Sequence, residues 1–147
     1  MPASVTPTRT DFIPVVLGGD IGSYALIREF HEAYHIKSIA LGPGFIGAIT
    51  HSKLAELRFI EAYTPELLLK ALEEVHAQHP SKTIVLVANT DPLIETLEEL
   101  HAELPEYVSC TIPPRAAFDA VCDKGTFAEL CRKHGLEAPR AEVVHLA

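Results

Sequence analysis

The sequence has no tryptophan, only three cysteines, and no apolar run near the roughly 18–20 residues that cross a bilayer. Cys110, Cys122 and Cys131 are odd in number and lack C-x-x-C spacing, so neither a disulfide framework nor a zinc site is indicated. The first eleven residues are polar and lack the apolar segment of a secretory signal peptide. We therefore expect a soluble, cytoplasmic protein without a membrane partner.

Basic residues are also scarce. The 12 Lys and Arg residues stand against 20 Asp and Glu residues, which gives a net charge of −8. A nucleic-acid surface needs clustered cations, so we expect no nucleic-acid partner. Arg132-Lys133-His134 comes closest to a cluster, and we interpret it as the solvated face of a helix.

Two nucleotide-binding patterns and a complete metal-ligand set are missing as well. No G-x-x-x-x-G-K-[ST] loop occurs, and the glycines at positions 18, 19 and 22 do not fit G-x-G-x-x-G. No acidic residue ends the second expected strand to bind a ribose hydroxyl. His31 and His35 have a spacing that can bind a metal, but no third ligand accompanies them, so a solvated helix face is the simpler interpretation.

The stretch from Phe12 to Ile27 is the most informative part of the chain. An apolar run ends at Gly18-Gly19-Asp20, and a helical pattern follows. The order of buried strand, glycine turn and helix is typical of the start of an α/β sheet. Glycine allows the sharp turn, and the free N–H groups of the helix lie where ligands of open α/β sheets bind.

Strands and helices then alternate along the chain. The expected strands are Phe12–Leu17, Lys37–Leu41, Leu57–Ala62, Thr83–Ala88 and Tyr107–Ile112. The expected helices are Gly22–Tyr34, one that starts at Thr64-Pro65, one from Asp91 to about Leu104, and a helical turn within His51–Glu56. This alternation predicts a Rossmann-like, doubly wound, mainly parallel sheet of four or five strands. Pro14 suggests an edge position or an irregular entry for the first strand, and the apolar run 83–88 suggests a strand buried on both faces.

Three turns should line the ligand-binding edge of this sheet. They are Gly18-Gly19-Asp20, Gly42-Pro43-Gly44 and Asn89-Thr90-Asp91, each directly after a strand. Asn89, Thr90 and Asp91 can hydrogen-bond a carboxylate or an amine, but capping of the next helix explains them fully and is the favoured interpretation.

The chain is expected to have three parts. Residues 1–11 form a loose arm, residues 12–114 form the Rossmann-like domain, and residues 115–147 form a helical linker. The linker holds two short helices, a break at Pro139 and an apolar segment, Val143–Leu146, that resembles the start of another strand. We expect the chain to be cut from a longer protein, and the unpaired segment could support a homodimer through strand pairing.

The linker carries a family resemblance. The segment Asp123–Arg140 resembles the pattern D-K-x-x-F-x-x-L-x-x-x-x-G-[ILV]-x-x-P-x, which ends the pre-ATP-grasp domain of the ATP-grasp ligases. The chain keeps Asp123-Lys124, Phe127, Leu130, Gly135-Leu136 and Pro139 at that spacing. The Gly-Gly-Asp turn, the Asn89–Asp91 turn and the prolines after Cys110 look like the same family, whose members include biotin carboxylase and carbamoyl phosphate synthetase.

The resemblance implies a ligase that joins a carboxylate to an amine through an acyl-phosphate made from ATP. ATP and Mg²⁺ would be the cofactors of the full-length enzyme, held mainly by an ATP-grasp domain that this chain lacks, so the fragment is expected to bind neither and to be inactive alone. Gly18, Gly19 and Asp20 would form the substrate side of the cleft, for a carboxylate or amino acid, or they form a turn that is needed only for packing. Lys124 would reach the ATP phosphates, or it is a surface lysine beside Asp123.

A second hypothesis assigns the chain no catalytic activity. The chain could be a stand-alone Rossmann-like module that binds a small ligand or regulates a partner. A continuing reading frame with acidic metal ligands would favour the ligase over this module.

Overall fold

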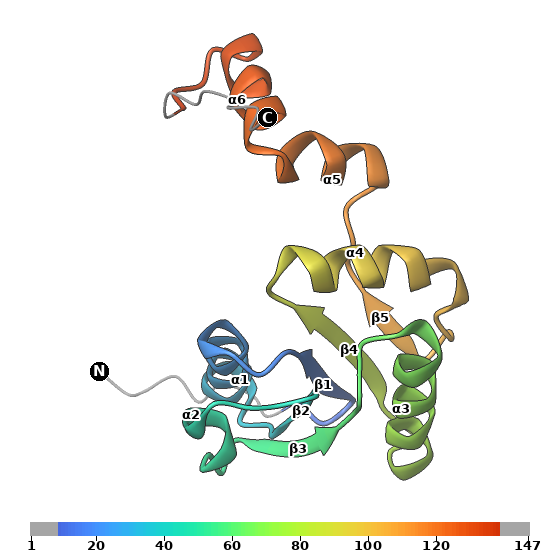
Figure 1. The fold of residues 1–147 in the computed structure, drawn as a ribbon. Coiled ribbons are helices and arrows are strands. Elements are labelled where there is room, and N and C mark those ends of the chain that lie inside the picture. The colour runs from blue at the N-terminus through green and yellow to red at the C-terminus, as the bar shows by residue number, and fades with distance from the viewer. Residues whose placement is uncertain (1–8, 139–147) are drawn as a thin grey trace. The chain divides into compact units, whose positions relative to one another are not determined.

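The computed structural model describes residues 9–138, and the central feature is one five-stranded sheet (Figure 1). The strands run in the order β3-β2-β1-β4-β5, and all four neighbouring pairs are parallel. Their bounds are β1 Phe12–Leu17, β2 Ser38–Gly42, β3 Ala55–Phe59, β4 Thr83–Ala88 and β5 Val108–Cys110. The expected Rossmann-like, doubly wound α/β fold is therefore confirmed.

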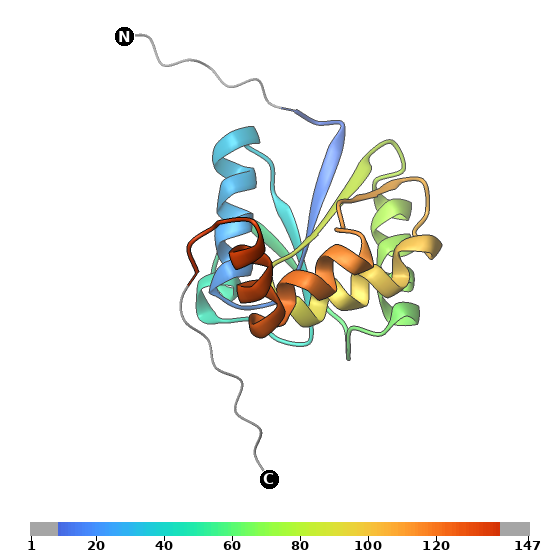
Figure 2. The same ribbon diagram turned by 90° about the horizontal axis from the view of Figure 1, so that it is seen from above.

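Helices cover both faces of the sheet (Figures 1 and 2). Helices α1 (Ile21–Tyr34) and α2 (Gly47–Thr50) lie on one face, and α3 (Pro65–Gln78) and α4 (Asp91–Leu100) lie on the other. A 3-10 turn, η1 (His101–Glu103), follows α4. The chain changes faces between β3 and β4, which is the arrangement that defines a doubly wound sheet.

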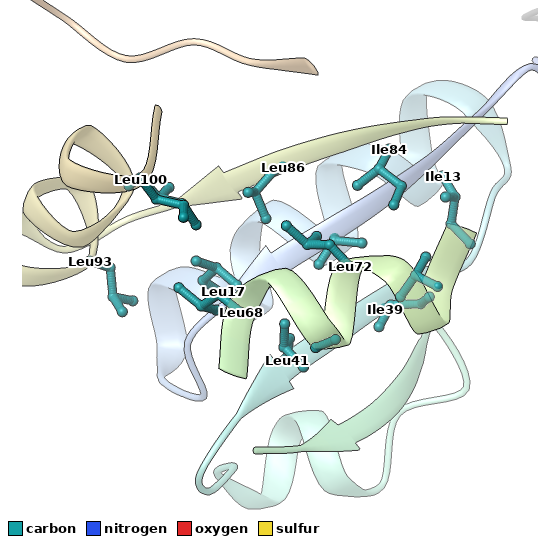
Figure 3. Close-up of a cluster of buried hydrophobic side chains, with 14 residues drawn as sticks. Ile13, Leu17, Ile39, Leu41, Leu68, Leu72, Ile84, Leu86, Leu93 and Leu100 are labelled. Carbon is teal, nitrogen blue, oxygen red and sulfur yellow. The ribbon is translucent and has the colours of Figure 1, made fainter. Parts of the chain in front are cut away.

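Two hydrophobic clusters hold these layers together. On the α3–α4 face, Leu68 and Leu72 of α3 and Leu93 of α4 pack on side chains that alternate along the strands (Figure 3). On the opposite face, Ile27 of α1 and Ile49 of α2 pack on a smaller set of strand residues, which are Val16, Ala40 and Ala55. The alternation of side chains along each strand assigns odd and even positions of β1 to different clusters.

The chain divides into two compact units, Met1–Ile112 and Pro113–Ala147, which are described separately. The second unit contains α5 (Arg115–Cys122) and α6 (Lys124–Lys133). Asp123 caps α6, since its Oδ1 accepts a hydrogen bond from the N–H of Thr126 at 2.8 Å. Most of the expected arm, the Pro139 break and the segment Val143–Leu146 lie outside the described residues.

The expectation that Pro14 marks an edge strand is wrong, because β1 lies in the centre of the sheet. The N–H of Gly18 donates to Leu41 of β2 at 3.1 Å, and N–H directions alternate along a strand, so the Pro14 nitrogen also faces β2. The β1–β2 register begins only at Val15–Ile39. The Pro14 nitrogen therefore faces β2 before the paired register begins, where a missing N–H costs no ladder hydrogen bond.

Other differences from the expected fold concern the bounds of helices and strands and the burial of strand side chains. The helical turn expected within 51–56 lies earlier, at α2. Strand β3 begins at Ala55, two residues before its expected first residue. Helix α4 ends at Leu100, and η1 occupies residues that we expected to continue it. Strand β4 is fully buried only on the α3–α4 face, at Ile84 and Leu86, while Val85 and Val87 are half-buried. Strand β3 is an outer strand, and its exposed Glu56 forms an ion pair with Arg58 at 2.8 Å.

Candidate functional site

The carboxyl ends of β1 and β4 form the candidate site. These strands are neighbours, but α1 after β1 and α4 after β4 lie on opposite faces of the sheet. Ligands of open α/β sheets bind at such a switch point, where the connections diverge. The sequence places Gly18-Gly19-Asp20 after β1 and Asn89 after β4, so the fold brings these two turns together.

Asp20 is the centre of a hydrogen-bond network that joins the two turns. Its Oδ1 accepts from the Ser23 N–H at 2.8 Å, from the Ser23 hydroxyl at 2.9 Å and from Asn89 Nδ2 at 3.1 Å. Asn89 Nδ2 also lies 3.3 Å from Oδ2, and Asn89 Oδ1 lies 3.1 Å from the Ser23 Oγ. Ser23 is fully buried. Its single hydroxyl proton can serve one of these acceptors at a time, so the network has a choice of hydrogen-bond patterns.

The glycines of the first turn are required by space as well as by backbone conformation. Gly18 has a φ of 111°, and a Cβ there would lie 2.4 Å from the Ser23 Oγ. A Cβ on Gly19 would lie 1.8 Å from the carbonyl oxygen of Gly44, because the turn after β2 packs directly on this turn. The N–H of Ile46 donates to the Gly19 carbonyl at 2.8 Å and fixes that packing.

The charge at this site is negative. The pKa of Asp20 is lowered chiefly by the Ser23 N–H bond; burial opposes this as the second-largest effect, and the Ser23 hydroxyl and Asn89 add smaller decreases. Asp20 is the N-cap of α1, so its carboxylate already occupies the anion position at that helix terminus. The turn therefore disfavours a phosphate and favours an ammonium group or a neutral hydrogen-bond donor.

Tyr63 also reaches this edge of the sheet. Its phenol oxygen lies 3.4 Å from the Leu41 carbonyl, and a Cβ on Gly42 would lie 2.4 Å from it. Burial raises the pKa of Tyr63, the backbone N–H of Gly18 opposes this rise, and the charge of Asp20 adds a smaller increase. The phenol is therefore protonated at neutral pH and is a potential donor.

Apolar side chains lie at the same edge of the sheet. Phe45, in the turn after β2, and Phe59, at the end of β3, have ring centroids 5.0 Å apart in an edge-to-face arrangement. Phe59 and Ile21 are each 70% exposed, which is high for large apolar residues. Exposed apolar groups beside a polar site are typical of surfaces that bind a ligand or another domain.

The remaining predicted site residues are not part of this network. Thr90 is the N-cap of α4 but makes no side-chain cap bond, and Asp91 is an exposed residue of its first turn. Lys124 is the first residue of α6 in the second unit and is exposed. The capping interpretation is wrong for Asn89, because its amide bonds to the turn after β1.

No metal centre is evident among residues 9–138, where no group of three or more His, Cys, Asp or Glu residues is placed to hold an ion. His31 and His35 lie on α1 and at its C-cap, with ring centroids 5.9 Å apart. Burial raises the pKa of Cys110 to about 11, so this thiol is protonated at neutral pH and is a poor nucleophile. Over the same residues, no helix is both long enough and apolar enough to cross a membrane.

Sequence reasoning missed Ser23 and Tyr63. Ser23 could have been found as the residue three positions after an Asp that begins a helix, which is the spacing of an N-cap bond. Tyr63 follows β3 and is distant in sequence from both turns, so only the order of the strands brings it to Gly18 and Gly42.

Comparisons with known proteins found one informative relative. The chain is 27% identical over 139 residues to a protein named D-aspartate ligase from Enterococcus faecium (strain Aus0004). The alignment covers 91% of this chain and 33% of that protein, so the chain spans about a third of the length of this relative. No family model matches the chain, and no solved structure matches it significantly. The similarity supports a distant relationship to a ligase.

Proposed function

We propose that this chain is the substrate-side, N-terminal domain of an ATP-dependent carboxylate–amine ligase of the ATP-grasp type. The observation that carries the proposal is the alignment of nearly the whole chain with one third of a protein named D-aspartate ligase. The Asp123-Lys124 linker pattern and the Rossmann-like fold support the same assignment. The substrate would be an amino acid or another small molecule with an amine and a carboxylate.

In such a reaction, ATP phosphorylates a carboxylate, the amine attacks the acyl-phosphate, and phosphate leaves. The described residues at the switch point do not fit the ATP phosphates, because the Asp20 carboxylate already fills the N-terminus of α1. No step through the nucleotide is therefore assigned to these residues. Their contribution would be to bind and orient the substrate, which can supply a large part of the rate enhancement. By resemblance, Lys124 would reach the nucleotide from the linker.

The experiment is ADP release by the full-length gene product, screened against amino acids and small carboxylates. We expect D-aspartate or a related amino acid to stimulate ADP release. Asp20→Asn should raise the KM for that amino acid about tenfold, because it removes the charge that attracts the ammonium group. Glu99→Gln changes an exposed acid of α4 outside the site and serves as the control. ADP release that no amino acid or carboxylate stimulates would contradict the proposal and favour a binding or regulatory module.

A further inference from the structure

Two complementary polar groups converge on Gly18. Asp20 follows Gly18 by two residues and is an acceptor with lowered pKa, and the Gly18 N–H and the Tyr63 hydroxyl both approach the Leu41 carbonyl, at 3.1 Å and 3.4 Å. Asp20 is close enough for its charge to act on the phenol. One group attracts a positive charge and the other is a hydrogen-bond donor, so the pair matches a ligand that carries both an ammonium and a carboxylate.

The Tyr63 proton has no strong acceptor among the described residues that the structure pairs with it. Its distance to the Leu41 carbonyl, 3.4 Å, is at the outer limit of a hydrogen bond, whereas O–H···O bonds usually measure about 2.7–2.8 Å. Because the Leu41 carbonyl already accepts from the Gly18 N–H at 3.1 Å, the protonated phenol can donate to another acceptor. A ligand carboxylate would be a better acceptor than this distant carbonyl.

The structure also keeps space for both groups. The absence of a side chain at Gly42 leaves room for the phenol, since a Cβ there would lie 2.4 Å from its oxygen. Asp20 is only partly exposed and is held by Ser23 and Asn89, so its carboxylate has a fixed direction. A donor and an acceptor that are already held in place lose little conformational freedom when a ligand binds.

We propose that Tyr63 and Asp20 together recognise a free amino acid, with the Tyr63 hydroxyl donating to a carboxylate of the ligand and Asp20 accepting from its ammonium group. This inference rests on the proposed function and specifies the substrate class. Tyr63 is a specificity residue in this arrangement, and a simple amine or a simple carboxylate satisfies only one of the two groups.

The test measures binding of D-aspartate to the 147-residue chain by calorimetry, beside its two mono-amides, D-asparagine and D-isoasparagine. We expect one of the two amides to bind about tenfold more weakly than D-aspartate, because it replaces the carboxylate that accepts from Tyr63. In Tyr63→Phe, D-aspartate should bind about tenfold more weakly. The penalty for amidation, which is the difference in affinity between D-aspartate and the weaker amide, should disappear in this variant. Asp20→Asn should instead remove the preference for the free amine over N-acetyl-D-aspartate.

Tyr107→Phe is the matched control. Tyr107 is another partly buried phenol with a raised pKa, but it stacks on His76 next to the start of β5, at the other end of the sheet. The Tyr107→Phe variant should bind all ligands as the unchanged chain does. Urea unfolding midpoints will show that each variant folds. A penalty for amidation that persists in Tyr63→Phe would overturn the inference, as would a lack of saturable binding of D-aspartate.

The two experiments distinguish a failure of this inference from a failure of the proposed function. If the full-length product releases ADP with an amino acid while Tyr63→Phe keeps its preference for the carboxylate, the inference fails and the ligase assignment stands. If binding depends on Tyr63 but no amino acid stimulates ADP release, recognition stands and the ligase assignment fails.

Discussion

The turn after β1 and the turn after β4 begin helices at the same end of the sheet, and they differ in how they satisfy the first N–H groups. In the first turn, Asp20 bonds to the Ser23 N–H and so caps its own helix. In the second turn, Thr90 makes no side-chain cap bond, and Asn89 extends to Asp20 instead. The second turn thus leaves its own helix without a side-chain cap and contributes to the order of the first. Hydrogen bonds from both turns therefore order the turn after β1, and the turn after β4 has fewer of its own.

The largest effect should come from Gly19→Ala. The new Cβ would lie 1.8 Å from the backbone oxygen of Gly44, so the packed turns must separate. We expect a loss of about 2–3 kcal/mol in the free energy of unfolding, measured with urea. Gly44→Ala is the matched control, because a Cβ there meets nothing within 4 Å, and it should change stability by less than about 0.5 kcal/mol. Equal effects of the two substitutions would contradict the described packing.

Asp20→Ala and Thr90→Ala compare the two caps directly. Asp20→Ala removes the cap bond and one of the acceptors of the buried Ser23 hydroxyl, so it should cost about 1–2 kcal/mol. Thr90→Ala removes no side-chain cap bond and should cost less than about 0.5 kcal/mol. Urea unfolding of both variants gives the comparison, and a larger loss in Thr90→Ala would reverse the assigned roles of the two turns.

The link between the turns should have a smaller energy. Asn89→Ala removes the amide that joins Asp20 to β4, and we expect a loss of about 1 kcal/mol. A double-mutant cycle with Asp20→Ala should show a coupling of about 0.5–1 kcal/mol, because each substitution removes the same bond. Additive effects would mean that the two turns do not support each other.

The pH dependence is the smallest expected effect. Because the pKa of Asp20 is lowered in the folded state, its stabilising contribution is fully present above the unfolded value of 3.8 and is lost as the pH falls through the folded-state value. The difference in unfolding free energy between the unchanged chain and Asp20→Asn should therefore shrink below about pH 4. A difference that stays constant from pH 7 to pH 3 would show that the carboxylate charge contributes nothing.

The fold could be predicted from the sequence because the strands and helices have strong periodic patterns. The run Thr83–Ala88 and the Thr64-Pro65 helix start were placed correctly from apolar pattern and capping residues alone. Two predictions failed where neighbours decide the outcome. Pro14 is tolerated in a central strand because of the register of β2, and Val85 and Val87 lack full cover because α1 packs over β1 and β2.

The candidate site could be predicted only in part. A turn after a strand can be recognised locally, so Gly18, Gly19 and Asp20 were found. The partners of those residues depend on strand order, since Asn89 is 69 positions from Asp20 and Tyr63 acts from the β3–α3 connection. A local pattern favours helix capping for Asn89, and only the proximity of the two turns shows that its amide is used elsewhere.

The outer strand β3 has a consequence for the behaviour of the chain at high concentration. Among residues 9–138, one edge of β3 has no neighbouring strand, so its main-chain groups could pair with a strand of another molecule and start a fibril. The Glu56–Arg58 ion pair puts charge on this strand, which hinders such growth. Engineering that replaces these two residues with apolar ones to strengthen the sheet would therefore risk precipitation, and both charges should be kept in variants made for crystals or assays.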